Sequence, residues 1–200
     1  MKAETSHATF DPVAVGHLET TAWASYYRRE WSRFLTAAIG MVRTGFGMGP
    51  RRTLAGAWWV LRANQVWAPY PNNDPDAARE YMRRFYALVS GAGYPHLVPI
   101  RAAALEVEWW RVHRMHQHSA DLTEDDLTRA LVDLYAYVYD VAPGAVEAAA
   151  RLRMQAMDAS DSWVKNGCQL DDPLLAQERR LLVASYSALR DAVDRARSQP

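Results

Sequence analysis

The fold is indicated most clearly by residues 172–193, which read DPLLAQERRLLVASYSALRDAV. The opening Asp-Pro pair is typical of a helix start, and small or apolar residues then recur every three or four positions. These residues are Leu174, Leu175, Leu181, Leu182, Ser185, Tyr186, Leu189 and Val193. Because this spacing places them on one stripe, we predict a helix from 172 to about 195 whose stripe packs into a core.

Similar signals divide the rest of the chain into six further helices. Proline marks most of the expected starts, and glycine, asparagine or proline marks most of the ends. The expected ranges are 11–44, 49–68, 74–91, 99–118, 123–139 and 143–166. No alternating apolar run with hairpin turns indicates a sheet. We therefore predict an all-α, single-domain bundle of about seven mostly antiparallel helices at 11–196, with a flexible N-terminus at 1–10 and a frayed tail at 197–200.

Composition excludes several functional classes. Lys+Arg and Asp+Glu are both 23, so the formal net charge of +0 provides no overall field to attract nucleic acid or an anionic membrane. No stretch reaches membrane-spanning length, and the N-terminus lacks the pattern of a signal peptide. Cys168 is the single cysteine, so no intramolecular disulfide can form. We expect a cytoplasmic protein with no nucleic-acid partner and no membrane partner.

The basic residues are almost all arginine, the exceptions being Lys2 and Lys165. Solvated helix faces are the usual place for such side chains. A guanidinium group can also pair with a carboxylate at two points, which allows some arginines to be partly buried beside Asp or Glu.

Aromatic residues are abundant, with 8 Trp and 10 Tyr among 200 residues. Each Trp or Tyr brings a hydrogen-bond donor that needs a partner when it is buried, so polar groups are expected among these rings. Two interpretations remain open. The aromatics either fill a core or line a cavity for a flat or apolar ligand.

One short pattern occurs in two expected helices. Leu18-Glu19 is followed by Trp23 and Tyr26, and Leu105-Glu106 is followed by Trp110 and His113. At 3.6 residues per turn, Glu19 aligns with Tyr26, and Glu106 aligns with His113. His116 lies one turn beyond His113. The pattern predicts two similar helix faces, each of which carries a carboxylate and an aromatic ring.

A metal site is one interpretation of these faces, because Glu and His supply ligands in carboxylate-bridged helical bundles. Asp158 and Asp161 could complete such a site with Glu19, Glu106 and His113. The Glu-x-x-His signature of di-iron bundles is absent, so buried Glu and His residues bonded to Arg, Trp or Tyr are the plainer alternative. A haem is indicated less, because the chain lacks Cys-x-x-Cys-His. We assign no metal ligands, and the cofactor is unknown.

Two function classes therefore remain open. In the first, the protein binds a small apolar or aromatic molecule through Trp23, Trp110 and His116. An enzyme of this class would use Glu19, Tyr26, Glu106, His113 and Asp161, either in metal-dependent oxidation or in acid–base chemistry with His113 as base, Glu106 orienting it and Tyr26 as donor. In the second, the aromatic core is purely structural and the protein associates with itself, as a homo-oligomer, or with another protein.

Overall fold

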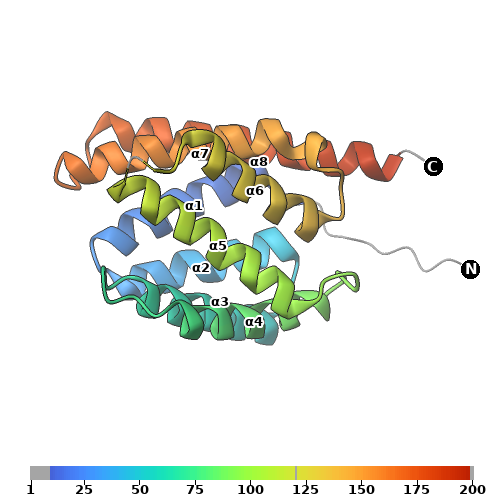
Figure 1. The fold of residues 1–200 in the computed structure, drawn as a ribbon. Coiled ribbons are helices and arrows are strands. Elements are labelled where there is room, and N and C mark those ends of the chain that lie inside the picture. The colour runs from blue at the N-terminus through green and yellow to red at the C-terminus, as the bar shows by residue number, and fades with distance from the viewer. Residues whose placement is uncertain (1–9, 120, 199–200) are drawn as a thin grey trace, which may run out of the picture.

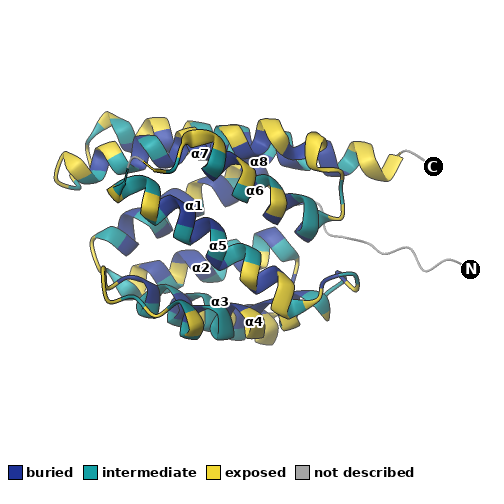
Figure 2. Cartoon of the chain, in the orientation of Figure 1, coloured by how far each residue is buried: buried dark blue, intermediate teal, exposed yellow. Residues whose placement is uncertain are grey.

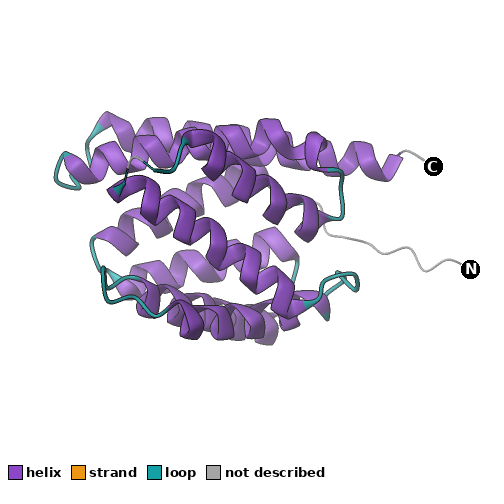
Figure 3. Ribbon diagram, in the orientation of Figure 1, coloured by secondary structure: helices purple, strands orange, loops and turns teal. Residues whose placement is uncertain are grey.

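The computed structural model describes residues 10–119 and 121–198, and within these residues the chain forms eight helices and no strand. Figure 3 shows helices joined by short loops. The helices are α1 (Pro12–Tyr27), α2 (Trp31–Phe46), α3 (Pro50–Trp67), α4 (Pro75–Ser90), α5 (Pro99–His118), α6 (Glu124–Tyr139), α7 (Pro143–Lys165) and α8 (Pro173–Ser198). The predicted all-α class is confirmed, but the count of about seven is too low by one.

The extra helix comes from the range 11–44, which the sequence predicts as one helix. Within that range α1 ends at Tyr27 and α2 begins at Trp31. The break is at Arg29, whose φ of 59° lies in the left-handed region. Its guanidinium donates to the carbonyl of Ala68 at 3.1 Å, which helps to hold the turn. Neither glycine nor proline marks this turn, and the apolar periodicity continues across it. The sequence therefore gives no local sign that the helix ends there.

Most other helix starts agree with the predicted capping residues. Asp11 and Asp74 accept hydrogen bonds from the first turns of α1 and α4. Thr123 and Asp126 form the reciprocal capping box at the start of α6. These contacts satisfy backbone N–H groups that have no partner inside the helix, which is why the sequence signals located the boundaries correctly.

The chain ends were predicted only in part. Residues 1–9 of the segment 1–10, predicted to be flexible, lie outside the described residues, but Phe10 is buried and contacts the rings of Tyr139 and Tyr186 at centroid distances of 6.1 and 6.0 Å. At the other end, α8 continues to Ser198, so residues 197 and 198 of the predicted frayed tail are helical. Residues 199 and 200 lie outside the described part.

The eight helices pack in a closed ring. Each helix contacts the next along the chain, and α8 returns to pack against α1 (Figure 1). Buried residues lie mainly on the inward faces and exposed ones on the outer faces (Figure 2). The ring closes at a glycine: a Cβ at Gly16 of α1 would lie 2.9 Å from the backbone nitrogen of Val183 in α8. The inside of this ring contains the candidate site.

Among the described residues, the structure has no helix that combines the length and the apolar character needed to cross a membrane.

Candidate functional site

A cavity of about 180 Å³ lies inside the helical ring, and every one of the eight helices contributes to its wall. Most wall residues are apolar or aromatic. The polar side chains in the wall are those of Glu19, Asn64, Tyr86, Glu106, Trp23, Trp109, Trp110, Tyr135, Tyr139, Arg153 and Tyr186. The cavity is therefore apolar on the whole, with polar groups at defined positions, as is usual for small-molecule sites.

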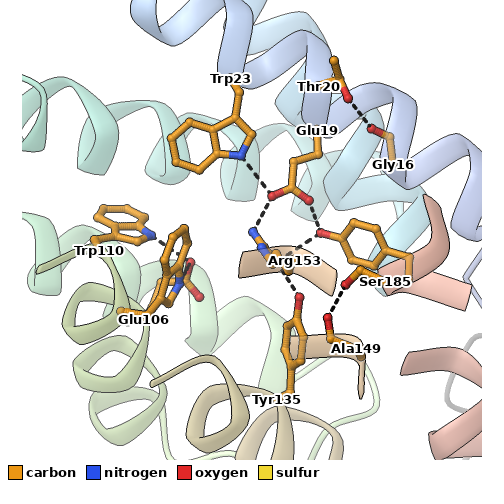
Figure 4. Close-up of polar contacts among 12 residues, drawn as sticks. Gly16, Glu19, Thr20, Trp23, Glu106, Trp110, Tyr135, Ala149, Arg153 and Ser185 are labelled. Carbon is orange, nitrogen blue, oxygen red and sulfur yellow. Dashed lines mark hydrogen bonds and ion pairs between the residues drawn. The ribbon is translucent and has the colours of Figure 1, made fainter. Parts of the chain in front are cut away.

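Glu19 of α1 is held by three donors at one side of the cavity. The Trp23 indole Nε1–H donates to Oε1 at 3.1 Å, and the Tyr186 hydroxyl donates to Oε2. Arg153 of α7 donates to Oε1 and forms a buried ion pair with Glu19 (Figure 4). Glu19 is only 2% exposed, so the ion pair compensates a charge that burial would otherwise penalise.

Arg153 is in turn fixed by two phenol groups. Its Nη1 donates to the Tyr135 hydroxyl at 2.9 Å and to the Tyr186 hydroxyl at 3.3 Å. Its guanidinium carbon lies 5.1 Å from the centre of the Trp109 ring. Burial lowers the pKa of Arg153, but the charge of Glu19 and the two tyrosines outweigh burial and raise it well above the usual value. Arg153 therefore stays charged.

Glu106 of α5 also accepts three hydrogen bonds. The Tyr86 hydroxyl donates to Oε2 at 2.7 Å, and the indoles of Trp109 and Trp110 each donate to Oε1 at 3.2 Å. Burial is the largest influence on its pKa and raises it above the usual value, although these hydrogen bonds act in the opposite direction. The side chain is nevertheless partly accessible and forms part of the cavity wall.

The repeated Leu-Glu pattern corresponds to a repeated local geometry. In α1 and in α5, a glutamate accepts a hydrogen bond from the indole of the tryptophan four residues later, Trp23 for Glu19 and Trp110 for Glu106. The two helices are four places apart in a ring of eight. Both glutamates line the same cavity, and Trp23 contacts Trp109 edge to face at a centroid distance of 6.2 Å. The two predicted faces therefore do meet inside the ring.

Tyr26 and His113 lie beside the main cavity. They line a smaller space of about 20 Å³ whose wall also contains Trp23 and Trp110. Nε2 of His113 lies 3.1 Å from Oδ2 of Asp161, so the partner of His113 is Asp161 and not Glu106 as the sequence suggested. Burial raises the pKa of Asp161, but hydrogen bonding and the charge of His113 outweigh it and lower the pKa.

The sequence predicts Tyr26 as a donor and His116 as a ligand-binding residue, and in the structure both side chains have partners within the protein. The Tyr26 hydroxyl accepts a hydrogen bond from Arg114 at 2.9 Å. His116 is absent from the walls of both cavities, and its Nδ1 lies 3.0 Å from the carbonyl oxygen of Leu122. His116 sits near the end of α5, where it packs against the following loop.

The donor set weighs against the predicted metal interpretation. Across the described ranges 10–119 and 121–198, no three His, Cys, Asp or Glu side chains are grouped closely enough to hold a metal ion. Glu19 and Glu106 bind Arg, Trp and Tyr donors, while Asp161 pairs with His113 and Asp158 lies 3.8 Å from His116. For the two glutamates this arrangement agrees with the plainer alternative of buried side chains bonded to Arg, Trp or Tyr, whereas His113 is bonded to Asp161.

Sequence reasoning missed the polar partners of the two glutamates. These partners are Tyr86, Trp109, Arg153 and Tyr186, and Tyr135 in turn accepts a hydrogen bond from Arg153. Arg153 carried a usable signal, because it occupies a core position in the buried stripe of α7 between Ala150 and Met157. An arginine at such a position indicates a buried ion pair.

Comparison of the chain with protein-family models, with curated proteins and with solved structures finds no match, so the site itself must support any functional assignment.

Proposed function

We propose that the protein binds a small, largely apolar organic molecule in the cavity inside the helical ring. The observation that carries this proposal is the cavity of about 180 Å³ to which all eight helices contribute. A dry apolar cavity of roughly 150 Å³ accommodates a molecule the size of benzene, so the volume suits a ligand with one ring and a short substituent.

The fixed polar groups of the wall support a binding role. Glu19, Arg153 and Tyr186 hold one another in place, and Glu106 is held by Tyr86 and two indoles. Side chains that are fixed before binding lose little conformational entropy when a ligand arrives. They also place hydrogen-bonding groups in an otherwise apolar wall, where they would determine the ligand's orientation.

An enzymatic role would use the same cavity, with Glu106 as the acid–base group. Its carboxylate lines the cavity and has a pKa raised by burial, a change that makes a carboxyl group a better proton acceptor once it is ionised. The His113–Asp161 pair lies beside the smaller cavity and would act only on a ligand that extends there.

Self-association is the second candidate, supported by Leu54 and Trp58 of α3. They are 57% and 48% exposed and lie one helical turn apart. Most of the tryptophans and tyrosines that suggested an interaction surface point inward instead, so this exposed pair is a small patch. If the protein associates through this patch, the double variant Leu54→Glu, Trp58→Glu will show a lower molecular mass than the wild type in sedimentation equilibrium.

The binding proposal is tested by filling the cavity. Gly45 of α2 lines the cavity, and a Cβ built there meets nothing within 4 Å. We expect benzene or indole to raise the melting temperature of the wild type, and benzene to change the fluorescence of Trp23, Trp109 and Trp110. Gly45→Leu should abolish both responses because the new side chain occupies the ligand's space.

Gly144→Leu is the matched control, since Gly144 is exposed on α7 and a Cβ there also meets nothing within 4 Å. This variant should keep the wild-type response. Equal responses of the Gly45→Leu and Gly144→Leu variants to either probe would contradict binding in the cavity.

A further inference from the structure

The charges in the cavity wall do not balance. The wall contains two carboxylates, those of Glu19 and Glu106, and one guanidinium, that of Arg153. Arg153 forms its ion pair with Glu19. Glu106 therefore contributes a carboxylate without an ion-pair partner in the wall.

The hydrogen bonds around Glu106 favour its ionised form. All three neighbours, Tyr86, Trp109 and Trp110, donate to it. An ionised carboxylate offers about four acceptor positions, so roughly one position remains free, on Oε2. Burial opposes ionisation because the charge has lost its water. A positive group placed at that free position would compensate the lost water and stabilise the ionised form. It would also complete the hydrogen bonding of the carboxylate.

The rest of the wall suits both the hydrocarbon part of such a ligand and the sides of its cationic group. Rings of Trp23, Trp110 and Tyr139 line the cavity with aliphatic residues such as Val42 and Leu134. Aromatic rings attract cations through their quadrupole and also bind apolar groups, and a desolvated cation–π contact is worth about 2 kcal/mol. An aromatic cavity with one spare carboxylate is thus complementary to an organic cation.

We propose that the ligand of the cavity is a small organic cation, namely an amine with one ring or a short aliphatic chain, whose ammonium group binds Glu106 while its hydrocarbon part lies among the aromatic rings. This inference rests on the proposed function and adds the ligand's charge to it.

Three probes of similar size separate charge from shape. Phenethylamine is the cation, propylbenzene is the neutral analogue, and 3-phenylpropionate is the anion. We expect phenethylamine to bind at least about tenfold more tightly than propylbenzene in calorimetry or tryptophan fluorescence at neutral pH. The anion should bind most weakly, because it would meet an unpaired carboxylate.

The Glu106→Gln variant tests whether the carboxylate of Glu106 binds the ammonium group. It preserves size and removes the charge, so the affinity for phenethylamine should fall at least about tenfold while that for propylbenzene stays unchanged. Propylbenzene binding also shows that the variant has folded with its cavity intact. Glu108→Gln is the matched control, because Glu108 lies on the same helix and pairs with Arg111 outside the cavity wall. This control should bind both probes as the wild type does.

The dependence on pH offers a second measurement on the wild type. Lowering the pH protonates Glu106 and should weaken binding of phenethylamine while leaving propylbenzene unaffected. The groups with the largest effects on Glu106 or from it are Tyr86 on α4, Tyr139 on α6 and Arg153 on α7, while Glu19 on α1 shares the cavity wall and is paired with Arg153. Burial raises the pKa of both tyrosines well above the usual value, and the pKa of Arg153 is raised as well, so none of the three changes charge in this range.

The outcomes separate the two proposals. Equal affinities for phenethylamine and propylbenzene, or tighter binding of the neutral probe, would overturn the cationic ligand and leave the cavity as a binding site. An unchanged affinity of the Glu106→Gln variant for phenethylamine would also overturn it. Binding of none of the three probes, together with no response to benzene or indole, would overturn the binding function itself.

Discussion

Glu178 of α8 is a carboxylate without hydrogen bonds in a closed part of the structure. It is 1% exposed, and neither of its oxygens has a hydrogen-bond partner. It lines a space of about 10 Å³ with Ser160 and His113, and the Ser160 hydroxyl is also without a partner. Burial, followed by the charge of Glu19, raises the pKa of Glu178 to about 9. Glu178 is therefore protonated at neutral pH in the folded protein.

This protonation makes stability depend on pH. In the unfolded chain Glu178 ionises near pH 4.5, whereas in the folded protein it ionises near pH 9. Between these values the folded state holds a proton on Glu178 that the unfolded chain has lost, so the contribution of Glu178 to the free energy of unfolding falls as the pH rises. From pH 4.5 to pH 7 the loss is on the order of 3 kcal/mol.

Glu178→Gln should remove this loss, because Gln has nearly the same shape and does not ionise. We expect the variant to be more stable than the wild type at pH 8 and similar to it at pH 5, as measured by urea unfolding at both values. Parallel stability curves for the two proteins across this range would show that Glu178 ionises normally in the folded state.

The ion pair between Glu19 and Arg153 leads to a second prediction. Arg153→Met should destabilise the protein by about 3–5 kcal/mol, because it leaves the charge of Glu19 buried without its partner. Adding Glu19→Gln to this variant should restore part of the loss, since the double variant contains no unpaired charge. Unfolding free energies of the two single variants and the double variant measure this coupling. Additive losses would contradict the interaction.

At the scale of residues, local spacing was predictable and distant pairing was not. The Glu19–Trp23 and Glu106–Trp110 contacts follow from helical geometry, because the partners are four residues apart. Arg153 is 134 residues from Glu19, and no spacing rule relates them. For the same reason the sequence pattern paired His113 with Glu106 on its own helix, because Asp161 lies 48 residues away on another helix.

Among the helices, the contact between α1 and α8 depends on the missing side chain of Gly16. A Cβ there would lie 2.8 Å from Cγ2 of Val183 and 2.9 Å from the backbone nitrogen of the same residue. The backbone atom cannot rotate away, so the two helices would have to separate. Because this contact closes the ring, a wider separation of α1 and α8 would loosen the packing of the whole bundle.

Gly16→Ala should therefore destabilise the protein by about 1–3 kcal/mol, although alanine is normally the better helix residue. Gly144→Ala on α7 serves as the control, because its added methyl group meets nothing within 4 Å. Chemical denaturation of both variants gives the comparison. Equal stability of the two would show that α1 and α8 tolerate a wider separation.

Helix positions were predictable wherever a capping side chain or a proline marks them. Asp11, Asp74 and the Thr123–Asp126 pair all cap helices at the expected positions. The turn between α1 and α2 escaped prediction, because Arg29 adopts the left-handed conformation that glycine or asparagine usually signals. The contact of Arg29 with Ala68 of a distant segment helps to hold that turn, and such a contact leaves no local trace in the sequence.

For the whole molecule, the cavity is a consequence of ring closure. Eight helices that pack mainly against their neighbours around a ring leave an interior that their side chains must fill. Phe10, Trp109 and Tyr135 are among the residues that line this interior, and about 180 Å³ of it remains open. Sequence patterns predicted aromatic rings near the buried carboxylates. They could not predict the unfilled volume, which depends on the order and spacing of all the helices.

Unfilled volume lowers stability, so a residue that partly fills the cavity should make the protein more stable and weaken ligand binding. Gly45→Ala places one methyl group in the open space beside α2 and replaces a helical glycine. We expect a gain of about 0.5–1 kcal/mol from the helix backbone, increased by up to about 0.8 kcal/mol for burying the methyl group. Urea unfolding measures the gain, and the affinity for phenethylamine or propylbenzene should fall in the same variant.

If stability rises and affinity for both probes stays unchanged, the ligand does not use the space beside Gly45. A fall in stability would contradict the open space assigned beside Gly45.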